Sequence, residues 1–568
     1  MLLFTGVNKK GVEKLNWVWY TVLFHPFFRK EYLMSDSVHH AHCCPPPPET
    51  LTVAQAEVSR RSFLGMGGVL MGGLSYVAMQ SALQAQATDD AAPIAMPTPR
   101  KPLIVKPILV YDLPQRAEKT SWRNWGGVQT QEAATEEVAR IKSELNAIER
   151  RADYPVEFMD ISAVNNINEL QSHTDIARCD VILLYGAGLG IYGIENFGKD
   201  VIFFQRWRSG PVYLQYEIIS PRFLRQHTDS AVLDVKGIGH ADVVTDKVEE
   251  LEWRLRALCG LKNTKGSKIV TIGGAGAWSQ PGTVVQDKVR EKWGFEYNDV
   301  NYDDMGRLIR EAKADEKAMV RAKKRAEAYL NIPGTVLDLT SNDKTTYDFF
   351  LNCFVLDDVF RMLMQKAGTN MITVNSCMGA IMPASETTAC LTLTTLNDDG
   401  YQAFCESDFV SIPVGVLLGN ISGKPVFLCN PNYPHDNIIT VAHCTAPRKM
   451  DGKTLNPVRI VTHMESDYGA APWVEVPLQT KTTHLAASFD TNRCLGFRGT
   501  IVDVPFRPIC RTQFDIRYEF PDSLLAERVP GFHWMTCFGD YRKEVGYALR
   551  RVGIQWENLD EVPTKSMS

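Results

Sequence analysis

Two apolar segments that run directly into glycine-rich turns constrain this chain more than any other feature. Val181–Tyr185 is followed by Gly186-Ala187-Gly188-Leu189-Gly190, and Lys268–Ile272 is followed by Gly273-Gly274-Ala275-Gly276. A buried strand that leads into such a turn is typical of doubly wound α/β units with parallel sheets. The repeat therefore predicts two α/β units, one after the other along the chain.

The remaining patterns fit this fold class. Short apolar runs predict further strands at Leu103–Val110, Val201–Phe204 and Met371–Asn375. Apolar residues at helical spacing predict helices over 130–150, 249–258, 311–330 and 541–552. From Pro413 on, short strands and turns take over. The prediction is an α/β protein with two Rossmann-like doubly wound units and a mainly β C-terminal domain, with domains at 103–265, 266–412 and 413–568.

The first 87 residues have the pattern of an export leader. Ser59-Arg60-Arg61-Ser62-Phe63-Leu64-Gly65 is a twin-arginine motif, an apolar stretch follows over 66–79, and Ala85-Gln86-Ala87 is a small-residue cleavage site. We expect export through the twin-arginine translocase to the periplasm or the extracellular space. A membrane anchor is the alternative, but the stretch is broken by glycines and shorter than the ~20 residues of a span. Residues 88–102 read as a linker, and Met34 is an alternative start.

Composition excludes some function classes. The chain has 568 residues, 45% of them hydrophobic and 22% charged, which is ordinary for a globular protein of about three domains. The net charge of −5 and the lack of a basic patch argue against nucleic acid as a partner. The 13 cysteines include no C-x-x-C pair and so show no disulfide framework. Several lie in apolar segments and are predicted to be buried thiols: Cys377, Cys390, Cys405 and Cys444.

Two acids stand at the end of a predicted strand. Leu391–Leu396 alternates and is predicted as a strand, 397–400 is a turn signal, and Tyr401–Cys405 is predicted as the next, buried strand. Glu406 and Asp408 follow it directly. In an extended segment residues i and i+2 point to one side, and ligands of open α/β sheets bind at the carboxyl ends of strands. The acids are therefore predicted to line a site, with a solvated loop as the alternative.

Two histidines complete a candidate metal site. His443 ends an apolar run, and His533 lies between aromatic residues far downstream. Carboxylate oxygens and imidazole nitrogens together suit a hard or borderline divalent ion such as Mn²⁺. The combination predicts metal-assisted chemistry on a polyhydroxy substrate.

Several C-terminal motifs resemble one enzyme family. Cys405-Glu406-Ser407-Asp408 and Ser422-Gly423-Lys424-Pro425-Val426-Phe427-Leu428 are followed by Thr462–Gly469 and by Gly531-Phe532-His533. Together they resemble the L-fucose isomerase and L-arabinose isomerase superfamily, most clearly over residues 370–560. The resemblance implies an aldose–ketose isomerase with Mn²⁺, or another divalent cation, held by two acids and a late histidine. It also implies the three-domain layout and, because hexamers are frequent in that family, a homo-oligomer.

The resemblance assigns roles to individual residues. Asp408 and His533 match metal ligands, and Glu406 is expected to be the catalytic base, with Asp408 beside it in the catalytic set. Glu386 is the nearest upstream acid for a third ligand. In such a reaction a proton moves between C1 and C2 through an ene-diol, so a Lewis acid and an acid–base group are both needed.

Other side chains are predicted to contact the sugar substrate. His443, Arg448 and Trp534 lie near the motifs just described, and Trp122 belongs to an aromatic loop near the start of the first α/β unit. Aromatic rings stack on sugar rings and cations bind hydroxyls, although tryptophans more often belong to a core.

Three other functions stay open at this point. One is a non-catalytic sugar-binding protein on the same fold. The second is a secreted NAD(P)-dependent oxidoreductase that uses the glycine loops, although neither loop is a full G-x-G-x-x-G motif with a following acid. The third is a metal-dependent lyase or epimerase with the same acids.

Overall fold

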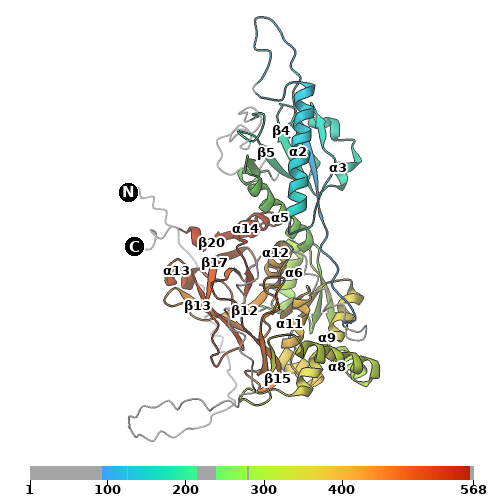
Figure 1. Cartoon of the computed structure of the whole chain (residues 1–568), viewed down its shortest axis with the longest axis vertical. Coiled ribbons are helices and arrows are strands. Elements are labelled where there is room, and N and C mark those ends of the chain that lie inside the picture. The colour runs from blue at the N-terminus through green and yellow to red at the C-terminus, as the bar shows by residue number, and fades with distance from the viewer. Residues whose placement is uncertain (1–91, 125, 214–237, 278–279, 563–568) are drawn as a thin grey trace, which may run out of the picture. The chain divides into compact units, whose positions relative to one another are not determined.

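The computed structural model describes residues 92–124, 126–213, 238–277 and 280–562 (Figure 1). These residues all fall within one compact unit, Tyr76–Ser568. The predicted export leader, residues 1–87, lies outside the described residues. In the part of the chain that is described, no helix has the length and apolar character needed to cross a membrane.

The first sheet is parallel throughout. Its strands run in the order β2-β1-β4-β5-β6, with β3 also paired to β1. They are β1 (Leu103–Val110), β2 (Val156–Phe158), β3 (Ser162–Val164), β4 (Val181–Gly186), β5 (Asp200–Gln205) and β6 (Val243–Thr245). All six residues of β4 are buried, as its continuous apolar sequence requires in a sheet covered on both faces.

The second sheet is also parallel, with the strand order β11-β10-β7-β8. It consists of β7 (Lys268–Ile272), β8 (Glu296–Val300), β10 (Met371–Val374) and β11 (Gln402–Cys405). Two parallel sheets with helical connections confirm the α/β fold class.

The C-terminal sheet closes on itself. The order β16-β19-β12-β13-β18-β17 is antiparallel, and β17 pairs back to β16, so that these strands form a ring to which β20 is added. The strands are β12 (Phe427–Pro431), β13 (Ile438–His443), β16 (Lys481–Ala487), β17 (Arg493–Asp503), β18 (Thr512–Arg517), β19 (Trp534–Phe538) and β20 (Gln555–Asn558). A separate three-stranded sheet packs against the ring, where Val474 N donates to Thr512 Oγ1 of β18 at 3.1 Å. Its strands are β9 (Thr335–Leu337), β14 (Val458–His463) and β15 (Tyr468–Val474).

Helices connect and cover these sheets. The longer ones are α2 (Gln131–Arg151), α5 (Val248–Thr264), α6 (Gly282–Trp293), α7 (Tyr302–Ala314), α8 (Glu316–Leu330), α9 (Tyr347–Ala367), α11 (Cys390–Asp398), α12 (Ile412–Ser422) and α14 (Arg542–Arg550). Shorter ones are α3 (Thr174–Arg178), α10 (Met382–Ser385) and α13 (Asp522–Arg528). Figure 1 shows α14 beside α5, and Arg256 of α5 pairs with Glu544 of α14 at 3.3 Å.

Two secondary-structure predictions were wrong. Leu391–Leu396 lies in the helix α11, not in a strand, and every residue of this helix is buried. Alternating leucine and threonine resembles a strand, but here the threonine hydroxyls bond to nearby carbonyl oxygens, as Thr394 does with Cys390 O at 3.1 Å. The helix predicted over 311–330 is two helices, because Asp315 ends α7 and its side chain accepts a hydrogen bond from Lys317 N at the start of α8.

Close packing between α12 and β19 brings the second sheet against the ring. Gly415 of α12 faces Met535 of β19 so closely that a Cβ would lie 2.6 Å from the methionine sulfur. Leu417 and Leu418 belong to the same buried apolar cluster as Met535. Burying such side chains stabilises the junction by about 1.5–3 kcal/mol each. The junction places the end of β11 next to the start of β19.

Candidate active site

A partly exposed carboxylate, a histidine and a buried carboxylate form a row at this junction. Glu406 and Asp408 follow β11, and His533 precedes β19. Oε2 of Glu406 lies 2.9 Å from Nε2 of His533, and Oδ2 of Asp408 lies 2.7 Å from Nδ1 of the same ring. The imidazole therefore bridges the two carboxylates through its two nitrogens.

The turn that carries Glu406 has an unusual backbone. Glu406 and Ser407 have φ values of +65° and +47°, which cost non-glycine residues roughly 1–2 kcal/mol each. The loop after β7 holds this turn, because Gly276 N donates to Ser407 O at 2.9 Å and Phe409 N donates to Gly276 O at 3.1 Å. Strain of this kind gathers at functional sites, where the surrounding structure fixes a side chain in one direction.

Hydrogen bonds from the segment after Asp408 hold both Asp408 and His533 in place. Oδ1 of Asp408 accepts a hydrogen bond from Val410 N at 3.1 Å. The hydroxyl of Ser411 donates to the backbone oxygen of His533 at 2.8 Å. Because both the ring and the backbone of His533 have partners, its Nε2 is directed at Glu406.

A second histidine faces Glu406 from the ring of strands. His443 ends β13, and its Nε2 lies 3.3 Å from Oε1 of Glu406. Its Nδ1 lies 3.0 Å from the hydroxyl of Thr445, which fixes the rotation of the imidazole. Each carboxylate oxygen of Glu406 thus faces one histidine.

The charges of the row stabilise each other. Burial alone would raise the pKa of Glu406, but the hydrogen bonds and charges of His443 and His533 outweigh it and hold this pKa well below its usual range. Burial alone would lower the pKa of His533, but Asp408 and Glu406 raise it to about 9. At neutral pH the row therefore contains an imidazolium between carboxylates.

Of Glu406, Asp408, His533 and His443, only Glu406 is open to solvent. The side chain of Glu406 is 38% exposed, whereas those of His443, Asp408 and His533 are 6%, 2% and 0% exposed. A ligand that reaches this site therefore meets the Glu406 carboxylate, with the other three residues behind or beside it.

No protein-family model matches this chain, and neither does any curated protein. The membership of the sugar isomerase superfamily stays a prediction. The two motifs on which it most depends, at residues 405–408 and 531–533, lie side by side in the fold through the contacts of His533.

The predicted Mn²⁺ ligands do not gather around one point. Both nitrogens of His533 are occupied by carboxylates on opposite sides, and the Glu386 carboxylate lies 2.6 Å from Nζ of Lys313 on α7. Within the described residues, the group of three donors within 4.8 Å of one another is Cys405, Glu406 and His443. A sulfur donor in the set favours a softer ion than Mn²⁺, such as Zn²⁺. The donors present do not fit the predicted manganese site.

Two predicted side chains are not part of the row: Glu386, which is exposed, and Trp122, which is half-buried. The side chain of Glu386 is 67% exposed and its backbone is left-handed, with φ +56°. Trp122 lies in an irregular segment after β1, and the guanidinium of Arg123 stacks on its ring at 5.1 Å. No contact of Trp122 with the row occurs among the described residues.

Two other predicted contacts to substrate are core residues instead. Arg448 has no exposed surface, donates from Nε to Asn456 O at 2.8 Å, and stacks on the ring of Tyr329 at 5.1 Å. Trp534 is 1% exposed and packs edge-on against Phe497 at 5.5 Å. Trp534 packs against Phe497 of β17, whereas the imidazole of His533 faces Glu406, so the aromatic neighbour of the site histidine does not share its surface.

The glycine loops serve close packing of the chain. A Cβ on Gly190 would lie 1.9 Å from Asn165 O, and one on Gly273 would lie 2.0 Å from the hydroxyl of Tyr302. The amide of Leu189 donates to the internal carboxylate of Asp112 at 3.1 Å. This loop amide is therefore already bound to a carboxylate of the protein itself.

Sequence reasoning missed the residues that support the row. Ser411 and Thr445 fix His533 and His443, but isolated hydroxyl residues give no signal by themselves. Ser411 precedes α12, which has Pro413 in its first turn. This serine–proline spacing is a helix-start signal that could have located the turn between Asp408 and α12.

Proposed function

We propose that the chain is an exported sugar isomerase that interconverts an aldose and a ketose through an ene-diol, with Glu406 as the group that moves the proton. One observation carries this proposal: the solvent-facing carboxylate of Glu406 is backed by a buried Asp408–His533 pair. A positioned carboxylate open to ligand and fixed by an imidazole is what proton abstraction next to a carbonyl requires. The resemblance to the fucose and arabinose isomerases supplies the substrate class.

Glu406 would act on one face of the sugar. Its carboxylate takes the proton from C2 and returns it to C1, while the hydroxyl proton passes from O2 to O1. The imidazolium of His533 offsets the negative charge that develops during the transfer, and Asp408 keeps that cation in place. A carboxylate held at low pKa is a weak base, so substrate is expected to displace one of the two histidine contacts before transfer.

We infer that the two parallel sheets are Rossmann-like doubly wound units, that the protein forms homo-oligomers, and that it works in the periplasm or outside the cell. No step is assigned to Mn²⁺, because the donors predicted for it do not gather. A divalent ion at this site would be held by Cys405, Glu406 and His443.

A second candidate is a sugar-binding protein without turnover on the same fold. It is favoured by the ion pair that already occupies Glu406 and by the Lys313 partner of Glu386. The two candidates differ in one property: only the isomerase would exchange the C2 proton of the sugar with solvent.

Proton exchange tests the proposal directly. The purified protein is incubated in D₂O with a panel of aldoses and ketoses, and NMR follows loss of the C2 proton and appearance of the isomer. We expect exchange with at least one sugar, loss of exchange in Glu406→Gln, and no loss in the control Glu386→Gln. Sugar binding without exchange would support the second candidate. Full exchange in a folded Glu406→Gln variant would overturn the catalytic role of Glu406.

A further inference from the structure

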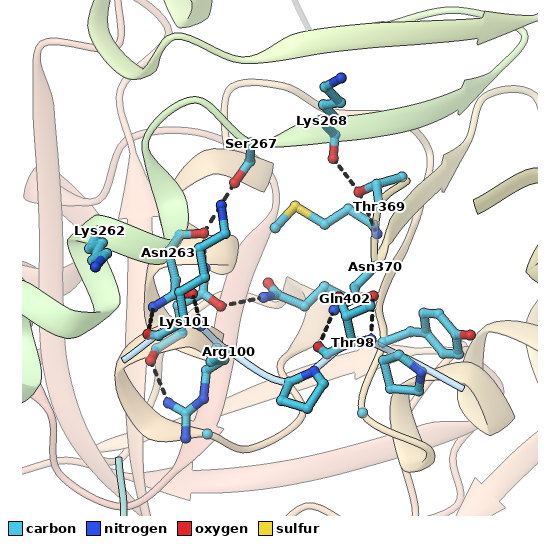
Figure 2. A pocket seen from close by; sticks show the side chains of 18 of the residues that line it. Thr98, Arg100, Lys101, Lys262, Asn263, Ser267, Lys268, Thr369, Asn370 and Gln402 are labelled. Carbon is cyan, nitrogen blue, oxygen red and sulfur yellow. Dashed lines mark hydrogen bonds between the residues drawn. The ribbon is translucent and has the colours of Figure 1, made fainter. Parts of the chain in front are cut away.

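A cavity lies where the strands of the second sheet begin, at the end opposite to Glu406. It has a volume of about 460 Å³ and is lined at the first residues of three strands: Lys268 of β7, Met371 of β10 and Gln402 of β11 (Figure 2). Glu406 follows the other end of β11. The cavity is therefore separate from the candidate active site, and its volume falls in the range of small-molecule sites.

The wall of the cavity is basic. Six of its lining residues are cations and none is an acid: Arg100, Lys101, Lys262, Lys265, Lys268 and Lys424. Two of the cations are paired with acids that do not line the cavity, because Lys262 lies 2.6 Å from Asp180 and Lys268 lies 3.4 Å from Glu296. The other four make no ion pair among the described residues.

Helix ends reduce this charge but do not cancel it. The C-terminal ends of α5, α9, α11 and α12 all contribute to the lining. Each helix end carries roughly half a negative charge, so four of them offset roughly two of the four remaining cations. The cavity keeps an excess of roughly two positive charges.

A segment held by paired hydrogen bonds forms one side of the cavity. Asn370 accepts from Thr98 N at 2.9 Å and donates to Thr98 O at 2.7 Å. Asn263 accepts from Lys101 N at 2.8 Å and donates to Lys101 O at 2.9 Å. Figure 2 shows these pairs along the segment. The two asparagines fix the positions of Arg100 and Lys101, so this wall is built into the fold.

Two of the four cations without an ion pair, Arg100 and Lys424, donate hydrogen bonds to backbone oxygens of the protein. Nη1 of Arg100 donates to Asn420 O at 2.7 Å, and Nζ of Lys424 donates to Phe538 O at 2.9 Å. Burial lowers the pKa of Arg100 more than Cys259 and Asp153 raise it, as expected for a cation with too few negative neighbours. Lys101 and Lys265 are exposed and no side-chain partner is present for either in the described part of the chain. They are the groups available to an incoming anion.

We propose that this cavity binds a small anion with a phosphate or sulfate group, of the size of a phosphorylated or sulfated monosaccharide. The excess positive charge selects the anion, and Lys101 and Lys265 contact it. The hydroxyl of Thr369 donates to Lys268 O and the amide of Gln402 donates to Asn420 Oδ1, so the two lysines remain the groups that select the ligand. Oε1 of Gln402 is buried and accepts no hydrogen bond from the described residues.

Calorimetry with defined probes tests this site on the full chain. The probes are glucose 6-phosphate, glucose 6-sulfate, inorganic phosphate and uncharged glucose, each at low and high salt. We expect the two charged sugars to bind, glucose to bind at least about tenfold more weakly, and salt to weaken binding through screening. Tighter binding of the phosphate or of the sulfate ester would identify the preferred group.

Matched variants locate the binding. The double substitution Lys101→Gln with Lys265→Gln is expected to weaken binding of the charged sugars about tenfold, since two charge-assisted contacts are lost. Lys323→Gln on the exposed face of α8 is the control and is expected to change nothing. Equal weakening in the control, no binding at about 10 mM, or unchanged affinity in the folded double variant would each overturn the proposal. Because binding is measured without turnover, failure here leaves the function of Glu406 a separate question.

Discussion

Nδ1 of His533 lies 2.7 Å from Oδ2 of Asp408, although 125 residues separate them in the chain. The pair is buried, and only its far side, at Nε2, leads toward the surface through Glu406. A carboxylate behind a histidine fixes the ring and supports its cationic form. This relationship makes Asp408 a positioning residue, and it separates the role of Asp408 from that of the solvent-facing Glu406.

Asp408→Asn is expected to slow C2 proton exchange roughly 10–100-fold, because the amide supports the His533 cation less well than a carboxylate does. The pKa of His533 should fall from about 9 toward its ordinary value. NMR titration of the histidine ring measures this shift beside the exchange rate. Asp451→Asn, on a loop, is the control. An unchanged His533 titration in a folded Asp408→Asn variant would contradict the positioning role.

Stability should decrease as the pH rises above neutrality. The pKa of His533 is raised from 6.5 to about 9 in the folded protein. Its contribution is therefore complete below pH 6.5 and is lost as pH rises through about 9, with a size of the order of 3 kcal/mol. Thermal unfolding between pH 6 and pH 10 measures this slope. The slope should be shallower in His533→Gln, and an equal slope in that variant would assign the effect to other groups.

The same row should lose stability in acid for a different reason. The pKa of Glu406 is lowered, so its contribution is present above its unfolded value of 4.5 and is lost as pH falls through the folded value. Glu406 and His533 are partners in one ion pair, so their contributions are not added. Unfolding curves between pH 2 and pH 5 should show a smaller loss for Glu406→Gln than for the unchanged chain. Equal losses would show that Glu406 does not govern acid stability.

Part of this site was accessible from the sequence because its signals are local. The strand β11 and the acids after it follow from a buried apolar run between turn signals, and His533 was singled out with them. The contact of His533 with both acids depends on the packing of β19 against α12, which no local pattern encodes. Sequence resemblance was the only guide to that long-range contact.

Complete burial explains the wrong predictions for α11, Arg448 and Trp534. In α11 the leucine–threonine alternation buries all positions, so the period of two does not distinguish a strand from a helix. Arg448 and Trp534 were predicted as substrate contacts because cations bind hydroxyls and aromatic rings stack on sugars. Their burial depends on Tyr329 and Phe497, which come from other parts of the chain.

Metal competition should favour zinc over manganese at this site. The donors are Cys405, Glu406 and His443. A sulfur donor binds Zn²⁺ more tightly than it binds the harder Mn²⁺. After equilibration with equal Mn²⁺ and Zn²⁺ and removal of free ions, elemental analysis is expected to find zinc. Cys405→Ser should reduce the bound zinc, and Cys494→Ser, at a buried position outside the group, should not. Bound manganese that is insensitive to Cys405→Ser would contradict this donor set and would return attention to Asp408 and His533.

The loop after β7 offers a direct test of whether its glycines serve packing. Gly273 and Gly274 have nearly equal φ values, +78° and +82°, so alanine suffers similar backbone strain at both. They differ in their surroundings, because a Cβ at Gly273 would overlap the hydroxyl of Tyr302 whereas one at Gly274 meets nothing within 4 Å. Gly273→Ala should therefore lower the free energy of unfolding by about 1–3 kcal/mol more than Gly274→Ala. Chemical denaturation measures both. Equal losses would mean that Tyr302 moves aside at no cost, and its hydrogen bond to Asn375 O, 2.9 Å long, would then not fix the edge of the sheet next to Glu406.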